Sequence, residues 1–536
     1  MTWKDNLSKA LVSYPKPDIK FAYGTAGFRT KADILDYVNF TVGILASIRS
    51  AYLDGKTVGV MVTASHNPPP DNGVKVVDPS GNMLESSWES YATTLANSTH
   101  EELISNIEKL VQQLGLDTGK LDSYAARVVL ARDSRDSSPR LSQASIDGLS
   151  VFPSTTYQDY GLFTTPQLHY VTRTSNDAAF GKPTAEGYYE KMSLAFHKIF
   201  ELSGGDSNKI DITVDAANGV GAPKAEELFD KYLSDNIAYQ LVNAEYSKPE
   251  LLNWDCGADF VKTNQKLPNN VSNPEKNKLY ASFDGDADRL ILYYVNSNNE
   301  FRLLDGDKIS TLIALFFQRL FQNLQGLDLN IGVVQTAYAN GSSTQYVEDV
   351  LKLPVRCTPT GVKHLHHEAT NFDIGVYFEA NGHGTVVFSP EAESKIFNHV
   401  AANKEEEKAL QILQEFTKLI NQTVGDAISD LLAILVVVNY LKYSPEDWDK
   451  SYSDLPNRLI KVIVPDRSIF KTTNAERTLV EPQGLQGKID ALVEKFPKGR
   501  SFVRASGTED AVRVYAEADT PENAEELSRL VGELVK

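Results

Sequence analysis

Several apolar runs in this chain end in short polar loops, and this pattern constrains the fold more than any other feature. Residues 58–62 lead into the loop 63–68, and residues 279–283 lead into the loop 284–289. Runs of this length are typical of buried strands, and segments with apolar residues at helical spacing lie between them. Strands that alternate with helices form open α/β sheets, which place their chemistry at the carboxyl ends of the strands. We therefore expect doubly wound α/β domains whose loops carry the functional groups.

The length of the chain indicates more than one domain. At 536 residues it exceeds what a single hydrophobic core organises, and about three to five domains are expected. The alternation of strands and helices continues over roughly the first 440 residues, with a new start near Pro183. One long helical segment is expected over 403–441, and the turn-rich stretch 445–456 is the expected linker to a separate C-terminal domain.

The net charge and the cysteine content indicate which binding partners and which cellular compartment to expect. The formal net charge is −18 and the sequence pI is about 5.1. An acidic chain disfavours nucleic acid and anionic membranes as partners, and a phosphorylated substrate then needs a locally positive site. The chain has two cysteines, residues 1–20 lack an apolar segment, and the longest apolar run, 431–438, is shorter than a membrane span. These features favour a protein of the reducing cytoplasm.

The loop 63–68, Thr-Ala-Ser-His-Asn-Pro, offers a nucleophile. Ser65 lies just beyond the end of an expected strand, and His66 beside it has an ordinary pKa that suits proton transfer. Lys75, at the end of the sequence Asn-Gly-Val-Lys, is expected near Ser65. An isolated Ser-His pair would more often be a plain polar turn, so this interpretation depends on the other loops of the chain.

Three carboxylates at alternate positions form the second loop. Asp284, Asp286 and Asp288 can turn toward one cation, and hard oxygen ligands at this density suit Mg²⁺. An EF-hand is excluded, because Arg289 occupies the sixth loop position, where glycine is needed, and Val295 occupies the twelfth, where glutamate is needed. A phosphatase loop in which Asp284 is itself the nucleophile stays open as an alternative.

Further loops have groups suited to a sugar phosphate. The loop 504–508, Arg-Ala-Ser-Gly-Thr, together with Arg513 offers guanidinium, hydroxyl and amide donors for a phosphate dianion. The loop 379–383, Glu-Ala-Asn-Gly-His, offers donors and acceptors for sugar hydroxyls, and the loop 24–29 ends in the cation Arg29. Each loop is a weak signal alone. A serine loop, an aspartate loop and an anion-binding loop in one chain together indicate phosphoryl transfer.

In their order along the chain, these loops resemble those of the α-D-phosphohexomutase superfamily. The matching segments cover nearly the whole chain and are residues 24–29, 63–68 with 72–75, 161–166, 215–219, 284–289, 379–383 and 504–508. Two features are similar to the eukaryotic branch that acts on N-acetylglucosamine phosphates. The serine loop precedes the element 132–135, and Asn381 stands where bacterial relatives usually carry serine, so Asn381 bears most on substrate choice.

The resemblance implies an α/β protein of four domains around a central cleft, three doubly wound α/β domains and a smaller α+β C-terminal domain. The implied domains are 1–182 with the phosphoserine loop, 183–298 with the metal loop, 299–440 with the sugar-binding loop and 441–536 with the phosphate-binding loop.

The resemblance also implies a reaction. N-acetylglucosamine 6-phosphate and N-acetylglucosamine 1-phosphate would be interconverted through a phosphoserine at Ser65 and a sugar 1,6-bisphosphate, which also serves as activator, in UDP-N-acetylglucosamine biosynthesis. One Mg²⁺ would be held by Ser65 and the three aspartates. The implied partner is a small amino-sugar phosphate, with no nucleic acid, membrane or obligate protein partner. The alternatives are activity on glucose or mannose phosphates and, less favoured, an aspartate-nucleophile phosphatase.

Roles for individual residues follow from the same resemblance. The implied catalytic residues are Ser65, His66, Lys75 and Arg29, and the general base stays open between His66 and Lys75. The implied substrate-binding residues are Glu379, Asn381, His383, Arg504, Ser506, Gly507, Thr508 and Arg513.

Overall fold

The computed structural model describes residues 2–205, 209–324, 326–506 and 510–536. The chain forms two compact units. The first unit contains the residues up to Leu303 together with Glu415–Asn439, and the second contains Leu304–Gln414 and Tyr440–Lys536. Each unit therefore combines two separate stretches of the chain.

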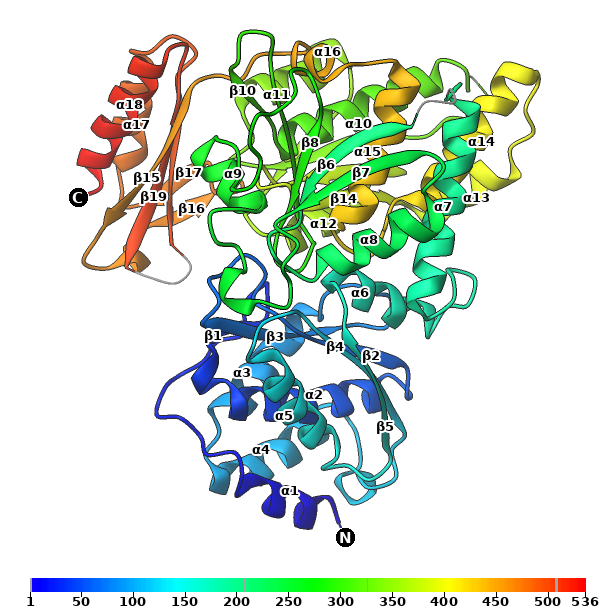
Figure 1. The fold of residues 1–536 in the computed structure, drawn as a ribbon. Helices are drawn as coiled ribbons and strands as arrows, with labels where there is room; N and C mark the ends of the chain where they lie inside the picture. The colour runs from blue at the N-terminus through cyan, green and yellow to red at the C-terminus, as the bar shows by residue number, and fades with distance from the viewer. Residues whose placement is uncertain (1, 206–208, 325, 507–509) are drawn as a thin grey trace. The chain divides into compact units, whose positions relative to one another are not determined.

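The first unit begins with a mixed five-stranded sheet and its helices. These elements are α1 (Trp3–Leu11), β1 (Phe28–Lys31), α2 (Asp36–Tyr52), β2 (Thr57–Val62), β3 (Asp71–Val77), α3 (Glu89–Asn97), α4 (His100–Gln113), β4 (Ala126–Arg132), α5 (Ser138–Leu149), β5 (Thr155–Leu162) and α6 (Thr165–Thr174). The strand order is β1-β3-β2-β4-β5, with β2, β4 and β5 parallel and β3 antiparallel to both of its neighbours. Helices α2 and α5 cover one face and α6 the other (Figure 1).

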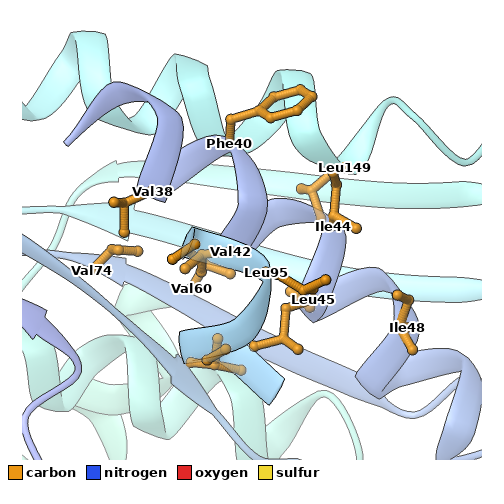
Figure 2. Packing of buried hydrophobic residues seen from close by; sticks show 14 of the residues in the cluster. Val38, Phe40, Val42, Ile44, Leu45, Ile48, Val60, Val74, Leu95 and Leu149 are labelled. Atoms are coloured by element: carbon orange, nitrogen blue, oxygen red, sulfur yellow. The ribbon is translucent and has the colours of Figure 1, made fainter. Parts of the chain in front are cut away.

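The core of this sheet follows the period-two alternation of its strands. Val60 of β2 and Val74 of β3 are buried and lie beside Val38, Val42 and Leu45 of α2 (Figure 2). The three helical residues recur at spacings of four and three, so they share one face of α2. Burial of these side chains fixes the register of β2, and the register sets which residue begins the loop after the strand.

A second sheet completes the first unit. Its elements are α7 (Ala185–Leu202), β6 (Ile210–Asp215), α8 (Gly221–Tyr232), β7 (Ile237–Val242), α9 (Ala258–Asn264), β8 (Tyr280–Phe283), β9 (Leu290–Val295) and β10 (Phe301–Leu304). The strand order is β10-β9-β8-β6-β7, with β6 parallel to β7 and β8, and β9 returning antiparallel to β8. Residues 284–289 form the connection between β8 and β9, so the predicted strand that leads into the aspartate loop is confirmed.

The segment predicted as one long helix is two helices, and that prediction was wrong. α14 (Lys404–Leu419) and α15 (Ala427–Leu441) are separated by residues 420–426. Oδ1 of Asp426 accepts hydrogen bonds from the N–H groups of Ile428 and Ser429, each at 3.1 Å, which caps α15 and starts a new helix. Although α15 is strongly apolar, no helix among the described residues is long and apolar enough to cross a lipid bilayer.

The described residues of the second unit form three sheets. Its elements are α10 (Gly306–Phe321), β11 (Ile331–Thr336), α11 (Gly341–Gln345), β12 (Val355–Thr358), α12 (Val362–Ala369), β13 (Ile374–Phe378), β14 (Gly384–Phe388), α13 (Pro390–Asn398), α16 (Pro445–Asp449), β15 (Asn457–Ile463), β16 (Lys471–Thr473), β17 (Thr478–Glu481), α17 (Leu485–Val493), β18 (Arg500–Ala505), β19 (Ala511–Glu517) and α18 (Pro521–Leu534). The sheet orders are β12-β11-β13-β14, β15-β19-β18 and β16-β17.

The stretch 445–456, predicted as a linker, packs against α10 within the second unit. Trp448 of α16 is 1% exposed, and its Nε1 donates a hydrogen bond to the carbonyl oxygen of Lys308 at 3.1 Å. The buried Lys308 Nζ donates in turn to the carbonyl oxygens of Asp449 and Tyr452 at 2.8 and 2.5 Å. A buried tryptophan and a buried ammonium group both need fixed partners, so this stretch packs into the core of the second unit, and its role as a linker stays a prediction.

Candidate active site

Ser65 lies in the loop that follows β2 and points at the aspartate loop. Its side chain is 1% exposed, and its Oγ donates a hydrogen bond to Asp284 Oδ2 at 2.5 Å. The N–H of Ser65 donates to Thr63 Oγ1 at 3.0 Å. The φ angle of Ser65 is 51°, a left-handed conformation that costs a residue with a Cβ about 1 kcal/mol or more. Contacts elsewhere in the fold must therefore stabilise this loop.

Arg135 supplies most of those contacts. Its buried guanidinium donates to three carbonyl oxygens of the serine loop, those of Ser65 (2.9 Å), Asn67 (2.8 Å) and Pro68 (2.8 Å), and to that of Asp71 (2.9 Å) at the start of β3. Asp133 neutralises the guanidinium through an Nε–Oδ2 contact of 3.0 Å. From the segment between β7 and α9, Asn253 Nδ2 also donates to the carbonyl oxygen of Ser65 at 3.0 Å. A planar group with five donors can hold several carbonyl groups in one geometry, so Arg135 fixes the main chain of the proposed nucleophile.

The three aspartates of the second loop come together. One carboxylate oxygen from each of Asp284, Asp286 and Asp288 lies within 4.8 Å of the other two, and all three side chains are buried. Asp284 Oδ1 accepts hydrogen bonds from the N–H groups of Asp288 and Arg289 at 3.0 and 3.1 Å. Thr165 Oγ1 donates to Asp286 Oδ2 at 2.6 Å. The loop thus curls around its own carboxylates, as predicted from their alternate spacing.

These carboxylates fit a divalent cation. Burial and the neighbouring Asp288 and Asp286 raise the pKa of Asp284 well above its ordinary value, and burial and Asp288 raise the pKa of Asp286. Asp286 Oδ1 is buried and accepts no hydrogen bond from any residue within the described ranges. A buried, ionisable oxygen beside two like charges is stabilised by a cation, and three hard oxygen ligands suit Mg²⁺.

Two basic side chains border the aspartates. Lys75 Nζ lies 3.9 Å from Asp288 Oδ2. Burial and the nearby Arg289 lower the pKa of Arg29, whereas Asp286 and Asp288 act to raise it. A guanidinium remains charged at neutral pH even with a lowered pKa. Both predicted cations therefore place positive charge at the aspartate cluster.

His66 also lies close to Asp284. One side-chain nitrogen of His66 and carboxylate oxygens of Asp259 and Asp284 lie within 4.8 Å of one another. Burial and Arg289 lower the pKa of His66 to about 4, so the imidazole is neutral at pH 7. Its Nδ1 is buried and has no hydrogen-bond partner in the part of the chain that the structure describes. The structure brings both candidate proton acceptors, His66 and Lys75, to the aspartate loop.

Two side chains at this site lie outside every segment that the sequence analysis singled out. Asn253 binds the serine loop, as described above, and Asp259 accepts from Arg289 Nη1 at 2.7 Å. Asp259 lies in the first turn of α9, where an acidic residue is favoured at any helix N-terminus. This local signal indicates where a helix begins and gives no sign of a functional site. The contact between Asp259 and Arg289 can therefore be found only from the fold.

In the second unit, residues 379–383 form the turn between β13 and β14. The N–H of Glu379 donates to the carbonyl oxygen of His383 at 2.8 Å, and the N–H of His383 donates to Asn381 Oδ1 at 3.0 Å. Gly382 has a φ of 87°, which this turn requires. Asn381 Nδ2 lies 3.4 Å from Glu379 Oε2. The turn gathers a carboxylate, an amide and an imidazole, groups that bind sugar hydroxyls.

The predicted phosphate-binding residues lie on the C-terminal sheet of the same unit. Arg504 of β18 and Arg513 of β19 are partners in the antiparallel register, so both guanidinium groups leave the same face. Ser506 follows β18 and is buried. Gly507 and Thr508 lie outside the described residues. Two arginines on adjacent strands match the charge and donor geometry of a phosphate dianion.

Comparison with known proteins identifies the family. The models of phosphoacetylglucosamine mutase AMG1, domains II and III, match residues 181–291 and 305–443. The models of phosphoglucomutase/phosphomannomutase, alpha/beta/alpha domain I and C-terminal domain, match residues 43–103 and 459–532. The phosphoacetylglucosamine mutase of Candida albicans is 67% identical over 549 residues, and the match covers 100% of both chains. The chain belongs to the phosphoacetylglucosamine mutase family.

Solved structures agree with this family. A crystal structure of N-acetylglucosamine-phosphate mutase in the product complex, a member of the α-D-phosphohexomutase superfamily, matches with a TM-score of 0.97 at 68% identity over 100% of both chains. The N-acetylphosphoglucosamine mutase of Aspergillus fumigatus, in complex with GlcNAc-6P and magnesium, matches with a TM-score of 0.94 at 49% identity, covering 100% of this chain and 99% of that chain. A serine-to-alanine variant of the Aspergillus enzyme, in complex with glucose 1,6-bisphosphate, matches with a TM-score of 0.93 at 49% identity, covering 100% and 98%.

These comparisons confirm two predictions. The resemblance to the α-D-phosphohexomutase superfamily is confirmed by the relatives, and the four-domain α/β class is confirmed by four family models that follow one another along the chain. The limits of the four domains and the roles of individual residues stay predictions.

Proposed function

We propose that this protein interconverts N-acetylglucosamine 6-phosphate and N-acetylglucosamine 1-phosphate. The observation that carries the proposal is the 2.5 Å hydrogen bond from Ser65 Oγ to Asp284 Oδ2, because it places a nucleophilic hydroxyl at a cluster of cation-binding carboxylates. The names of the relatives and the sugar phosphate bound by the Aspergillus enzyme support the substrate.

In the proposed cycle, Ser65 carries a phosphoryl group. The O1 hydroxyl of N-acetylglucosamine 6-phosphate attacks this phosphorus, the new O1–P bond forms, the Oγ–P bond breaks, and the hydroxyl proton passes to a nearby base. The resulting 1,6-bisphosphate turns around, and Ser65 Oγ then attacks the other phosphorus. The O6–P bond breaks, O6 takes up a proton, the phosphoryl group returns to Ser65, and the 1-phosphate leaves. The bisphosphate bound to the Aspergillus variant supports an intermediate of this kind.

The first unit would carry out the transfer. Asp284, Asp286 and Asp288, with an oxygen on Ser65, are the groups that would hold Mg²⁺, which when bound neutralises charge on the transferred phosphoryl group. Lys75 lies close enough to add fixed positive charge to the same place. Arg29 adds a second cation, and the proton would pass to Lys75 or His66, which both border the aspartates.

The second unit would bind the rest of the substrate. The proposed sugar ligands are Glu379, Asn381 and His383, and the proposed ligands of the non-reacting phosphate are Arg504, Ser506, Gly507, Thr508 and Arg513. A phosphate held at a distance from the reacting atoms orients the sugar, and orientation of this kind can lower a barrier by several kcal/mol. The same grip must accept a 1-phosphate and a 6-phosphate, since both occur in one cycle.

The proposal extends to the setting of the reaction. Both cysteines, Cys256 and Cys357, are free thiols, which supports a reducing compartment such as the cytoplasm. The partner we propose is the amino-sugar phosphate itself.

A phosphatase with Asp284 as nucleophile is the weaker alternative. Both carboxylate oxygens of Asp284 are already engaged, Oδ1 by two backbone N–H groups and Oδ2 by Ser65. A nucleophile needs an oxygen that is free to approach phosphorus, so this geometry favours Asp284 as a ligand.

The test is a coupled assay with N-acetylglucosamine 6-phosphate, Mg²⁺ and a trace of sugar 1,6-bisphosphate, run beside glucose 6-phosphate and mannose 6-phosphate. We expect N-acetylglucosamine 1-phosphate as product and the highest kcat/KM for the N-acetylated sugar. A preference for the glucose or mannose phosphate would agree with the proposed mechanism and contradict the proposed substrate. Release of inorganic phosphate without formation of a sugar 1-phosphate would contradict the proposal that the protein is a mutase.

A further inference from the structure

The main chain of the aspartate loop is held by the N-termini of three helices. Three successive carbonyl oxygens of the loop each accept a hydrogen bond from an N–H at the start of a different helix. The N–H of Val220, at the start of α8, donates to the carbonyl oxygen of Gly285 at 3.2 Å. The N–H of Thr165, at the start of α6, donates to that of Asp286 at 3.2 Å. The N–H of Ala427, at the start of α15, donates to that of Ala287 at 3.0 Å. The carbonyl groups are thereby turned toward the helices.

Ala287 depends most on this support. It is buried, and its φ of 58° is a left-handed conformation that is strained for a residue with a Cβ. Ala287 lies between Asp286 and Asp288, so rotation of its peptide would change the direction in which both carboxylates leave the main chain. The hydrogen bond from Ala427 fixes that peptide.

The start of α15 is itself built around a buried carboxylate. Asp426 accepts hydrogen bonds from the N–H groups of Ile428 and Ser429 at 3.1 Å, from the hydroxyl of Tyr188 at 2.8 Å, and from Asn421 Nδ2 at 2.9 Å. Tyr188 belongs to α7 and is buried, as is Asp426. With its carboxylate bound from both helices, Asp426 holds the peptide that carries the next N–H, that of Ala427.

We infer that the start of α15, through Asp426 and Tyr188, is a positioning element for the metal site. The inference rests on the proposed function, in which Asp286 and Asp288 are ligands of Mg²⁺. Within the described residues, neither Asp426 nor Tyr188 makes a hydrogen bond to a proposed metal ligand. They act through the hydrogen bond from Ala427 to Ala287. Outer partners of metal ligands commonly change metal affinity by about 10- to 100-fold when they are removed.

Ala427→Pro tests the hydrogen bond itself. Proline is favoured at the first residue of a helix, so α15 can form while the donor to Ala287 is lost and the ring presses on its carbonyl oxygen. We expect Mn²⁺, used as a paramagnetic substitute for Mg²⁺, to bind at least about tenfold more weakly in electron paramagnetic resonance titrations of the whole protein. The KM for N-acetylglucosamine 6-phosphate at saturating Mg²⁺ should change little.

The matched control for that variant is Ala185→Pro. Ala185 is also the first residue of a helix of the first unit, α7, and its N–H donates to no acceptor in the described part of the chain. Its Mn²⁺ affinity should equal that of the unchanged protein.

A milder pair of variants keeps the inference testable if Ala427→Pro does not fold. Tyr188→Phe removes only the hydroxyl that binds Asp426, and we expect a rise of about threefold in the dissociation constant of Mn²⁺. Tyr37→Phe is its control, because Tyr37 is another buried tyrosine of the first unit whose hydroxyl donates to the carbonyl oxygen of Ser98 at 2.7 Å. Tyr37→Phe should leave Mn²⁺ binding unchanged.

The outcomes separate the inference from the proposed function. If the unchanged protein binds Mn²⁺ and Asp286→Ala does not, the metal site stands. Equal affinity in Tyr188→Phe and the unchanged protein, or equal weakening in Tyr188→Phe and Tyr37→Phe, would then overturn the role of α15. If the unchanged protein binds no Mn²⁺, the proposed metal site fails and the inference fails with it.

Discussion

The guanidinium of Arg135 donates to the carbonyl oxygen of Ser65 at 2.9 Å, so a buried cation holds the peptide of the proposed nucleophile. Its counter-ion, Asp133, is buried as completely, and Asp133 Oδ2 also accepts from Thr63 Oγ1 at 2.8 Å. Removing two charges from water is costly, and such a pair often adds little net stability. We therefore expect the pair to serve mainly the geometry of the serine loop.

Replacing Arg135 with lysine tests this expectation. Lysine keeps the charge and loses the planar fork that reaches four carbonyl groups, so Ser65 should shift and kcat should fall by about 100-fold, with a small change in KM. Arg49→Lys is the matched control. Arg49 is also buried in the first unit, and it pairs with Asp78 and Glu85 at 2.8 and 3.1 Å. The control should lower the melting temperature and keep kcat, and equal losses of kcat in both variants would contradict the prediction.

Ser65→Ala should abolish turnover while the protein stays folded. Without Oγ, no phosphoserine can form, and intact mass spectrometry should find a phosphoryl group on the unchanged protein and none on the variant. Ser145→Ala removes another buried serine hydroxyl, from α5, and should retain full activity. Substantial turnover in Ser65→Ala would remove Ser65 from the nucleophile role.

Asp286→Asn should separate stability from activity. In the metal-free protein the three buried carboxylates repel one another, so removing one charge should raise the melting temperature in the presence of a chelator. The unchanged protein should gain thermal stability when Mg²⁺ is added, because the ion binds only the folded state, and the variant should gain much less and lose activity. Thermal unfolding with and without Mg²⁺ measures both effects. The same gain in both proteins would argue against the aspartates as ligands.

Arg504→Ala should weaken substrate binding. A guanidinium bound to a phosphate contributes a charge-assisted interaction, and its loss should raise KM for the sugar phosphate by about tenfold or more. Lys495→Ala, which removes an exposed charge on the same C-terminal domain, is the control and should leave KM unchanged. Steady-state kinetics decide the question, and an ordinary KM in Arg504→Ala would mean that the phosphate is held elsewhere.

The charge of Asp426 should make stability depend on pH. Burial raises the pKa of Asp426 from 3.8 to about 6, although its hydrogen bonds act to lower it. A carboxyl group whose pKa is raised in the folded state stabilises the fold fully when the pH is below its unfolded pKa, near 4. This stabilisation is lost as the pH rises through the folded pKa of about 6. Relative to Asp426→Asn, the unchanged protein should therefore lose up to about 3 kcal/mol of stability over this window. Unfolding of both proteins between pH 4.5 and 7.5 measures the difference, and a difference that is constant with pH would contradict the assignment.

The loops that carry Ser65 and Asp284 could be predicted because their signals are local. In each, an apolar run that must be buried ends in polar residues, and the end of the run marks where the strand stops. The alternate spacing of the aspartates predicted that they share one centre, and the structure brings them within 4.8 Å. The chemistry of these loops could therefore be predicted from a few consecutive residues in each.

The supports of those loops could not be predicted, since each comes from a distant part of the chain. Asn253 reaches the serine loop across 188 residues of sequence, and nothing near Asn253 signals that contact. The break between α14 and α15 was missed although residues 421–423 are polar and Gly425 directly precedes Asp426. The capping carboxylate was a further signal, as aspartate followed by an apolar run can begin a helix.

The separation of the first unit into two stretches of sequence has a consequence for how this chain can be divided or recombined. A fragment that ends at Leu303 contains the serine loop and the aspartate loop but lacks α15, so the carbonyl of Ala287 loses its donor. Hybrids between relatives would keep a working metal loop only if residues 415–439 are exchanged together with the residues up to Leu303. The proposed transfer site of this protein therefore depends on two segments of sequence, which are separated by more than a hundred residues of the other unit.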